Sequence, residues 1–178
     1  MRSDNNAVPR KENTVSRRNV LEALGIGIVA AGVSGCTSKR DATLTHADEL
    51  TPELYYSSAR ALASAIRTKE VSSVEVVQAF LDRIEAVNAA INAVVVLAGE
   101  EALDAAREAD AQLSRGEVTG PLHGVPMTIK DSIDTAGVVT TYGTKGRSAF
   151  VPPKDATVVA RLKSAGAILM GKTNTPEF

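Results

Sequence analysis

Residues 121–137, PLHGVPMTIKDSIDTAG, contain the clearest indication of the fold of this chain. The centre of the stretch is an apolar run at residues 125–129, which follows a turn containing Gly124 and leads directly into Lys130. A short apolar run between turn residues predicts a buried β-strand. Functional side chains gather at the carboxyl ends of strands in α/β sheets, so Lys130 is the first candidate for chemistry.

Lys130 can be interpreted in two ways. At the edge of an apolar interior the charged form of a lysine is disfavoured, which would let Lys130 act as a base near neutral pH. Alternatively, Lys130 pairs with the neighbouring Asp131 and has only a structural role. Its position in the sequence leaves both interpretations open.

Helical and strand patterns alternate on both sides of this stretch. Helices are predicted where apolar residues recur at helical spacing, and strands where a short run is continuously apolar. Four helices are predicted. The first covers residues 57–68, the second begins at a capping box of Ser72 and Glu75, and the other two cover residues 99–113 and 155–165. The predicted strands cover residues 93–97, 125–129 and 167–170. Continuously apolar strands between helices predict an α/β fold whose sheet is covered on both faces.

The apolar positions of each predicted helix give its inward face. These positions are Leu62, Ala65 and Ile66; Val74, Val77, Phe80, Leu81, Ile84 and Val87; Ala102, Ala106, Ala109 and Leu113; and Val158, Val159 and Leu162. Asp155 is predicted to cap the last of these helices and Gly166 to end it. Thr175, Pro176 and Glu177 have the pattern of a further helix start, so this chain is expected to be the N-terminal part of a longer protein.

The composition of the 178 residues is that of a soluble globular protein, with 44% hydrophobic and 23% charged residues. A net charge of -1 and an aromatic content of 3% give no basis for binding nucleic acid. The single cysteine excludes an intrachain disulfide. The two histidines, His46 and His123, are too few and too isolated for a His-rich metal site.

Residues 1–36 are predicted to form an export signal. Arg17 and Arg18 stand directly before an apolar, glycine-bearing run from Val20 to Val33, which leads into small residues. A basic segment, a short apolar run and small residues before a cleavage point describe a secretory signal, and the arginine pair is typical of the twin-arginine route. The protein is therefore expected to be exported to the periplasm or anchored on the extracytoplasmic side of a membrane.

Cys36 follows the residues Val33-Ser34-Gly35 and completes a sequence similar to a bacterial lipobox. In this interpretation Cys36 carries a lipid and is the first residue of the mature chain, and this lipid is the only membrane contact expected. The alternative is a plain signal peptide cut nearby, with Cys36 incidental. The polar residues 37–56 are predicted to form a linker to a body at residues 57–178.

Residues 121–137 closely resemble the lysine-bearing segment of the amidase signature family. Residues 155–162 and 166–174 look like the next stretch of the same family, in the same order. The resemblance runs from about Ala59 to Phe178. It implies that the body is the N-terminal, incomplete part of an amidase-signature-type domain, which is a mixed sheet covered by helices.

The resemblance implies an enzyme that hydrolyses or transfers carboxamides through a Ser–cis-Ser–Lys triad, with a small-molecule amide as substrate and with no cofactor or metal. Lys130 would be the base of this triad. In the family both serines lie downstream of the segment that matches residues 171–174, so they are expected outside this chain. Ser132, Ser148 and Ser164 do not lie in the Gly/Ser-rich setting that the family's serines require.

Other polar positions are weaker candidates. His123 is predicted to be a turn residue with a backbone hydrogen bond and not a member of a Ser-His-Asp triad, because no activated serine lies nearby. Residues 140–144 are predicted to form a loop, for which substrate contact and a plain turn both stay open. Lys172 ends an apolar strand much as Lys130 does and is expected to pack against the rest of the family fold. Asn174 is expected to hold its turn through a side-chain hydrogen bond.

Three functions remain compatible with these features: an amide hydrolase, a non-catalytic exported lipoprotein or binding module derived from an amidase fold, and an amidotransferase subunit. The export signal argues against a cytoplasmic transferase. The helix start at Thr175 argues against a self-contained binding module. The sequence therefore favours the hydrolase, without indicating its amide substrate or its oligomeric state.

Overall fold

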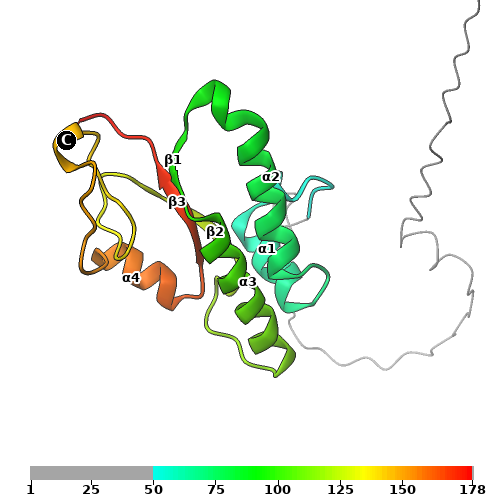
Figure 1. Cartoon of the computed structure of the whole chain (residues 1–178). Helices are drawn as coiled ribbons and strands as arrows, with labels where there is room; N and C mark the ends of the chain where they lie inside the picture. The colour runs from blue at the N-terminus through cyan, green and yellow to red at the C-terminus, as the bar shows by residue number, and fades with distance from the viewer. Residues whose placement is uncertain (1–49, 178) are drawn as a thin grey trace, which may run out of the picture. The chain divides into compact units, whose positions relative to one another are not determined.

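The computed structural model of the chain describes residues 50–177 (Figure 1). The predicted export signal, the lipidation candidate Cys36 and most of the predicted linker lie outside the described residues. No helix between residues 50 and 177 is both long enough and apolar enough to cross a membrane.

The described residues alternate helices with short strands, as the sequence predicts. The α-helices are α1 (Ala59–Arg67), α2 (Ser73–Ile91), α3 (Gly99–Ser114) and α4 (Thr157–Ser164), the strands are β1 (Val94–Leu97), β2 (Pro126–Lys130) and β3 (Ile168–Thr173), and the 3-10 helices are η3 (Leu54–Tyr56) and η4 (Lys145–Arg147). The prediction of an α/β fold is confirmed. The strand that was expected at residues 167–170 continues to Thr173, beyond the end of its apolar run.

The three strands form a mixed sheet in the order β1-β3-β2. β2 runs parallel to β3, and β1 runs antiparallel to it. The register places Lys130, the last residue of β2, beside Thr173, the last residue of β3. Because β2 and β3 are parallel, their carboxyl ends meet at one edge of the sheet, and this edge carries the candidate site.

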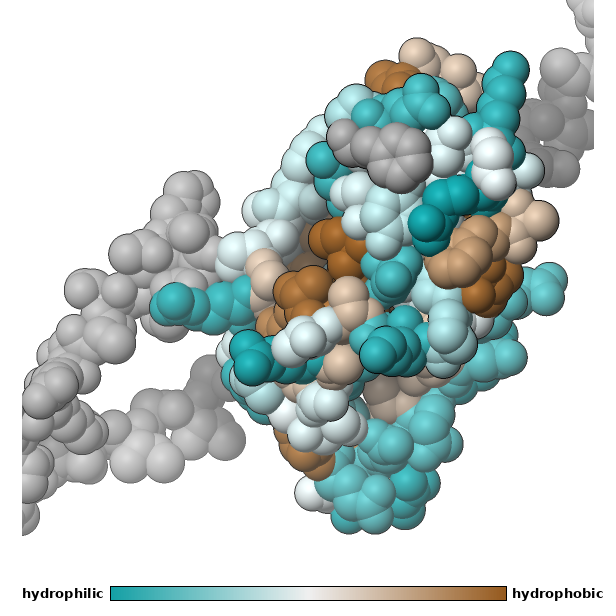
Figure 2. Space-filling view, turned by 90° about the vertical axis from the view of Figure 1, so that its left-hand side faces the viewer, coloured by the Kyte–Doolittle hydropathy of each residue, from teal (hydrophilic) through white to brown (hydrophobic). Residues whose placement is uncertain are grey.

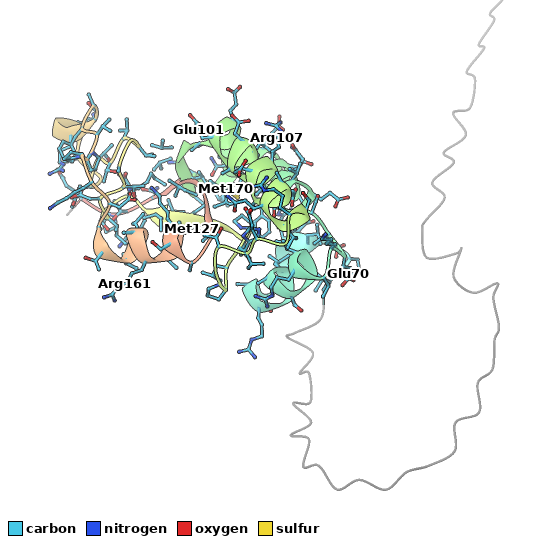
Figure 3. The ribbon with its side chains drawn as sticks, turned by 90° about the horizontal axis from the view of Figure 1, so that it is seen from below. Glu70, Glu101, Arg107, Met127, Arg161 and Met170 are labelled. Atoms are coloured by element: carbon cyan, nitrogen blue, oxygen red, sulfur yellow. The ribbon has the colours of Figure 1, made fainter. Side chains whose placement is uncertain are left out.

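Helices α1, α2 and α3 lie on one side of the sheet, and α4 lies on the other side with the long connection that follows β2 (Figure 1). The core between α2, α3 and β3 contains Val77, alanines of α3, Ile168 and Met170. Figure 3 shows Met170 between α3 and the sheet, while Glu101 and Arg107 lie on the outer side of α3. Of the predicted inward positions of α3, Ala102, Ala106 and Ala109 are buried, and Leu113 is partly buried.

The N-terminus of α2 is satisfied by side chains from two parts of the chain. Ser72 and Glu75 form the predicted capping box. The hydroxyl of Ser72 accepts from the backbone N–H of Glu75, and the carboxylate of Glu75 accepts from the backbone N–H of Ser72. In addition, the carboxylate of Asp110 on α3 accepts hydrogen bonds from the backbone N–H groups of Ser73 at 2.7 Å and Val74 at 3.1 Å. A negative charge at a helix N-terminus is stabilising, so this contact also fixes α3 against α2.

A β-bulge near Gly171 determines to which side of the sheet the side chains at the end of β3 project. The register between β2 and β3 shifts between Met127 and Thr128, and Lys172 therefore pairs with Ile129. Gly171 has φ +155°, and a Cβ atom there would lie 2.2 Å from the carbonyl oxygen of Val96. Only glycine fits this close approach of β3 to β1.

Three local predictions are wrong. Asp155 does not cap α4: the N-cap residue is Ala156, and it makes no side-chain capping bond. Val158 is 49% exposed, whereas its neighbour Val159 is fully buried, because the covered face of α4 includes Val159 and not Val158. β1 is not buried on both faces, since Val95 and Leu97 are exposed.

The predicted end of α4 is confirmed. Gly166 follows the C-cap residue Ala165 and has φ +92°, the conformation that ends many helices. A Cβ atom at Gly166 would lie 2.7 Å from the Cα atom of His123. By residue 177 no helix has begun after β3, so the predicted helix start at Thr175 stays a prediction.

Candidate active site

Lys130 stands at the carboxyl end of β2, as predicted, and its side chain is exposed in the described part of the chain. The preceding residue, Ile129, is 5% exposed and faces the interior. Successive residues of a strand project to opposite sides of the sheet, so Lys130 projects away from that interior. The predicted position of Lys130 is therefore confirmed, whereas the burial on which the first of its two interpretations depends is not found within residues 50–177.

Asp131 is buried and does not pair with Lys130. Its backbone N–H donates to the carbonyl oxygen of Thr173 at 2.9 Å, which continues the ladder past the end of β2. Its carboxylate oxygens each lie 3.1 Å from the backbone N–H of Thr141, and the hydroxyl of Thr141 also donates to this carboxylate. The structural alternative for Lys130, an ion pair with Asp131, is therefore not supported.

A cavity of about 270 Å³ lies beside Asp131 at this edge of the sheet. The loop after β2 contributes Thr141 and Gly143, the 3-10 helix η4 contributes Lys145, and the end of β3 contributes Asn174. Asn174 accepts a hydrogen bond from the backbone N–H of Thr175 at 2.8 Å, so the expected side-chain contact in this turn is present. Residues 140–144 thus form a loop that lines a cavity next to the end of β2.

Tyr142 holds the outer part of this loop in an unusual backbone conformation. Its φ is +55°, in the left-handed region that non-glycine residues seldom adopt. Its hydroxyl donates to Asp134 at 2.9 Å, and this hydrogen bond, with a smaller contribution from burial, raises the pKa of Tyr142. The guanidinium of Arg147 lies 4.3 Å from the Tyr142 ring centre and 3.9 Å from that of Phe150.

Lys172 is the buried lysine of the site, and sequence reasoning did not identify its role. Its side chain is fully buried within the described residues, and its Nζ atom donates to the carbonyl oxygen of Ile133 at 2.5 Å. It also donates to the hydroxyls of Thr135 and Thr140, each at 3.0 Å. Burial lowers the pKa of Lys172, and the negative charge of Asp131 acts in the opposite direction.

The position of Lys172 corrects the expectation that it packs against the rest of the family fold. Lys172 pairs with Ile129 in the sheet, so it projects to the side of the sheet opposite Lys130. The only sequence signal was a lysine after an apolar run, which Lys130 shares. The bulge near Gly171 sets which of the two lysines is buried, and the apolar pattern does not reveal this bulge.

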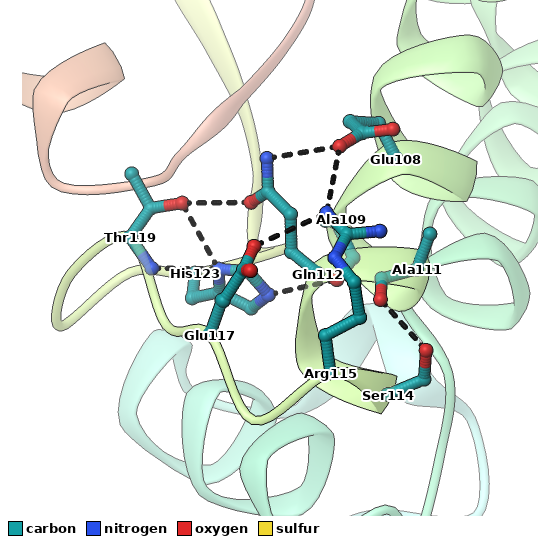
Figure 4. Close-up of polar contacts among 9 residues, drawn as sticks. All are labelled: Glu108, Ala109, Ala111, Gln112, Ser114, Arg115, Glu117, Thr119 and His123. Atoms are coloured by element: carbon teal, nitrogen blue, oxygen red, sulfur yellow. Dashed lines mark hydrogen bonds and ion pairs between the residues drawn. The ribbon is translucent and has the colours of Figure 1, made fainter.

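His123 has the structural role that was predicted (Figure 4). It is 1% exposed, and its Nδ1 atom accepts a hydrogen bond from the backbone N–H of Thr119 at 3.1 Å. The proton must then be on Nε2, which lies 3.0 Å from the carbonyl oxygen of Ala109 and donates to it. His123 therefore joins α3 to the turn before β2, and among residues 50–177 no serine is hydrogen-bonded to it.

Three serines follow Lys130 in the described part of the chain, and one of them, Ser148, lines the cavity beside Asp131. Ser132 is half-buried in the turn after β2, Ser148 is exposed at the end of η4, and Ser164 is the exposed last residue of α4. None of them is hydrogen-bonded to Lys130 in the described part of the chain. Between residues 50 and 177, no three His, Cys, Asp or Glu side chains are grouped so that they could hold a metal ion.

The fold is that of a mixed α/β protein, and Lys130 stands at the carboxyl end of a parallel strand, where such proteins often carry functional groups. The sequence profile of the Amidase family matches residues 75–178, and the chain belongs to this family. The resemblance noted in the sequence is confirmed at the level of the family.

Relatives with different reactions match this chain. It is 52% identical over 126 residues to a subunit of the glutamyl-tRNA(Gln) amidotransferase of Carboxydothermus hydrogenoformans, a match that covers 71% of this chain and 26% of that protein. It is 51% identical over 116 residues to indoleacetamide hydrolase of Bradyrhizobium diazoefficiens, covering 65% of this chain and 22% of that protein. The chain thus spans about a quarter of the length of these relatives.

The structure is similar to that of native peptide amidase from Stenotrophomonas maltophilia. The TM-score is 0.65 at 36% sequence identity, and the match covers 68% of this chain and 25% of that chain. Fatty acid amide hydrolase matches with the same TM-score at 31% identity, covering 71% of this chain and 23% of that one. These likenesses agree with the mixed α/β fold described above.

Proposed function

We propose that this protein contributes to an enzyme that hydrolyses the C–N bond of small carboxamides, with Lys130 as the base of a Ser–cis-Ser–Lys triad. One observation carries the proposal. Lys130 is the exposed last residue of β2, inside the segment that matches the Amidase family. Its side chain is accessible to residues that follow in the longer relatives, and both triad serines are expected there.

The proposed reaction has two steps. The nucleophilic serine attacks the amide carbon, and its proton passes through the bridging serine to the Nζ atom of Lys130. Lys130 then returns this proton to the leaving nitrogen as the C–N bond breaks, which releases ammonia or an amine and leaves an acyl-enzyme. Water then attacks the acyl carbon and gives a proton to Lys130. Lys130 returns it through the bridging serine to the nucleophilic serine as the carboxylic acid product leaves.

Transfer of ammonia to an acceptor is the second candidate function. The identity of 52% to an amidotransferase subunit favours it, and the identity of 51% to an amide hydrolase favours hydrolysis about equally. The predicted export signal decides our preference for hydrolysis, because the expected transferase works in the cytoplasm.

The test is steady-state kinetics of the product of the complete reading frame on simple aryl and aliphatic amides. We expect Lys130→Ala to lower kcat by about 10²–10⁴-fold with a much smaller change in KM, because proton transfer occurs in the transition state. Lys130→Arg should not restore turnover, since a guanidinium does not deprotonate near neutral pH. Lys154→Ala is the matched control, because Lys154 is also exposed and belongs to the segment before α4, not to β2.

Two results would reject the proposal. One is wild-type protein that is folded and has no amidase activity on any of these amides. The other is Lys130→Ala protein that keeps most of its turnover. We further propose that the 178-residue chain alone is inactive, because neither triad serine is expected in it, and turnover by the purified chain that disappears in Lys130→Ala would contradict this.

We also propose export through the twin-arginine route, with a lipid on Cys36. The support is the sequence of residues 1–36 alone. Replacing Arg17 and Arg18 by lysine should keep a fused reporter in the cytoplasm, and continued transport by the twin-arginine route would reject the signal. Metabolic labelling with a fatty acid should mark the wild type and not Cys36→Ser, and equal labelling of both would reject the lipid.

A further inference from the structure

The hydrogen bonds around Lys172 have fixed directions. Each threonine hydroxyl has one proton, and that of Thr135 is donated to the carbonyl oxygen of Ile133 at 3.1 Å. The hydroxyl of Thr140 donates in the same way to the carbonyl oxygen of Val138 at 3.1 Å. Both hydroxyls therefore offer only acceptor lone pairs to Lys172, and its third partner is a carbonyl. Three acceptors converge on one nitrogen, which matches the three N–H donors of an ammonium group.

This ammonium group has no carboxylate within ion-pair distance among the described residues. Asp131, Asp134 and Asp155 act on it at longer range and favour its charge, while Lys163 and burial oppose it. Asp131 is held by Thr141, and Asp155 accepts from Lys163 at 2.9 Å, so these carboxylates have other partners. Lys172 is therefore held in place by neutral acceptors of one loop and not by an ion pair.

The three acceptors all belong to the connection that begins directly after Lys130. Ile133 and Thr135 lie in its first turn, and Thr140 lies just before the residues that line the cavity at the end of β2. Lys172 itself is a residue of the central strand β3 and pairs with Ile129. One side chain thus joins both ends of the 133–140 loop to the central strand β3, next to the strand that ends at Lys130.

We propose that Lys172 is a positioning residue for the amidase reaction: its buried ammonium group holds the 133–140 loop on the sheet and thereby fixes the end of β2 and the cavity wall at Thr141. The role in catalysis rests on the function proposed above. The role in ordering the loop does not, and the two can be tested separately.

Hydrogen–deuterium exchange on the 178-residue chain tests the ordering of the loop. In Lys172→Met, which keeps the length of the side chain and removes its donors, we expect exchange at residues 140–144 to become at least about tenfold faster, with helices α2 and α3 unchanged. Lys154→Met is the matched control and should leave the loop as it is. Unchanged exchange at residues 140–144 in Lys172→Met, or an equal rise throughout the chain, would overturn the proposal.

Thr140→Val provides a second route if Lys172→Met does not fold. It removes one acceptor from Lys172 with little change in shape, and it should also raise exchange at residues 141–144 selectively. A folded Thr140→Val protein whose loop exchanges like the wild type would overturn the proposal as well.

Kinetics of the complete reading-frame product test the role in catalysis. We expect Lys172→Met to lower kcat by about 10- to 100-fold with KM changed by less than about threefold, because a displaced loop misplaces the reacting groups more than it weakens binding. Unchanged kcat, or a rise in KM alone, would overturn the positioning role. A wild-type protein without amidase activity would reject the proposed function instead. The hydrogen–deuterium exchange experiment would then still test whether Lys172 orders the 133–140 loop.

Discussion

Lys130 and Lys172 follow the same kind of apolar run, yet they have opposite environments. Lys130 ends an outer strand and is exposed, whereas Lys172 lies in the central strand and is fully buried. A buried lysine costs free energy unless its donors are satisfied, and the loop after β2 supplies three acceptors for Lys172. The same residue type is therefore exposed at the carboxyl end of one strand and buried within the next strand of the same sheet.

His123→Ala should destabilise the chain more than the removal of a nearby charged side chain. The substitution leaves the backbone N–H of Thr119 and the carbonyl oxygen of Ala109 without their buried partner and creates a cavity. We expect the free energy of unfolding to fall by about 3 kcal/mol, measured by urea titration followed by circular dichroism.

Arg115→Ala is the control for this experiment. Arg115 contacts Glu108 and Glu117 in the same part of the structure, but all three side chains are exposed (Figure 4). Exposed ion pairs contribute little, so its unfolding curve should match the wild type. Equal losses of stability in the two variants would show that His123 is not the buried link between α3 and the turn before β2.

The roles of single residues could be predicted from the sequence only where they depend on local features. The structural role of His123 followed from its place in a Gly/Pro turn, and the position of Lys130 followed from the strand before it. The burial of Lys172 depends on the register between β2 and β3, and the burial of Asp131 depends on a contact with Thr141. Both involve residues that are distant in the sequence or shifted by a bulge, so patterns within one segment do not reveal them.

At the scale of elements, Asp155 joins the loop after β2 to α4. Its carboxylate accepts from the backbone N–H of Ala136 at 2.8 Å and from Lys163 on α4 at 2.9 Å. Burial acts to raise the pKa of Asp155, but the hydrogen bonds from Lys163 and Ala136 outweigh it, and the pKa lies below its usual value of 3.8. Asp155 thus ties this loop to the helix that was expected to use it as a cap.

This lowered pKa predicts a pH-dependent stability. A carboxyl group whose pKa is lower in the folded state stabilises the protein above the unfolded-state pKa, and the stabilisation is lost as the pH falls through the folded value. Asp155→Asn should therefore lower the free energy of unfolding by about 1 kcal/mol at pH 6 and by progressively less as the pH falls below about 4.

Urea titrations of the wild type and Asp155→Asn at several pH values measure this difference. Asp104→Asn is the control, because Asp104 pairs only with Arg107 on the exposed surface of α3 and should matter little at either pH. A constant difference between wild type and Asp155→Asn from pH 6 to pH 3 would show that the ionised carboxylate of Asp155 does not stabilise the fold.

Helices and strands were predictable where one segment decides their formation. The capping box at Ser72 and the glycine stop at Gly166 are local signals, and both are confirmed. The burial of β1 was not predictable, because its apolar run is continuous although Val95 and Leu97 are exposed in the described structure. The faces of a strand are decided by what packs on it, and this information lies in other segments.

At the scale of the whole molecule, the described residues leave cavities and apolar residues at the surface. One cavity of about 450 Å³ lies between the start of α3, the start of β3 and residues 137–139. Figure 2 shows separate hydrophobic patches among hydrophilic residues on the side of the molecule that it presents. The chain covers about a quarter of the length of its relatives, so the function proposed above requires the parts of an amidase domain that those relatives contain in addition.

A chimeric enzyme tests this expectation. In indoleacetamide hydrolase of Bradyrhizobium diazoefficiens, the 116 residues that match this chain at 51% identity can be replaced by the corresponding residues of this chain. We expect the chimera to retain measurable hydrolysis of indoleacetamide, because the fold and the position of Lys130 are kept. Lys130→Ala in the chimera should lower kcat by about 10²–10⁴-fold.

The control chimera carries Lys154→Ala and should be as active as its parent. A folded chimera that fails to turn over, while the unmodified hydrolase is active, would show that this segment has lost its catalytic role. An active chimera that is insensitive to Lys130→Ala would assign the base to another residue.

The strand order β1-β3-β2 also affects how the chain behaves in solution. Both outer strands have one edge that makes no ladder within residues 50–177, and β1 adds the exposed side chains of Val95 and Leu97. Open edges of this kind are templates for pairing with another copy. Purified 178-residue chain should therefore self-associate as its concentration rises, with light scattering increasing before any loss of helical signal, and charged substitutions at Val95 should suppress this association.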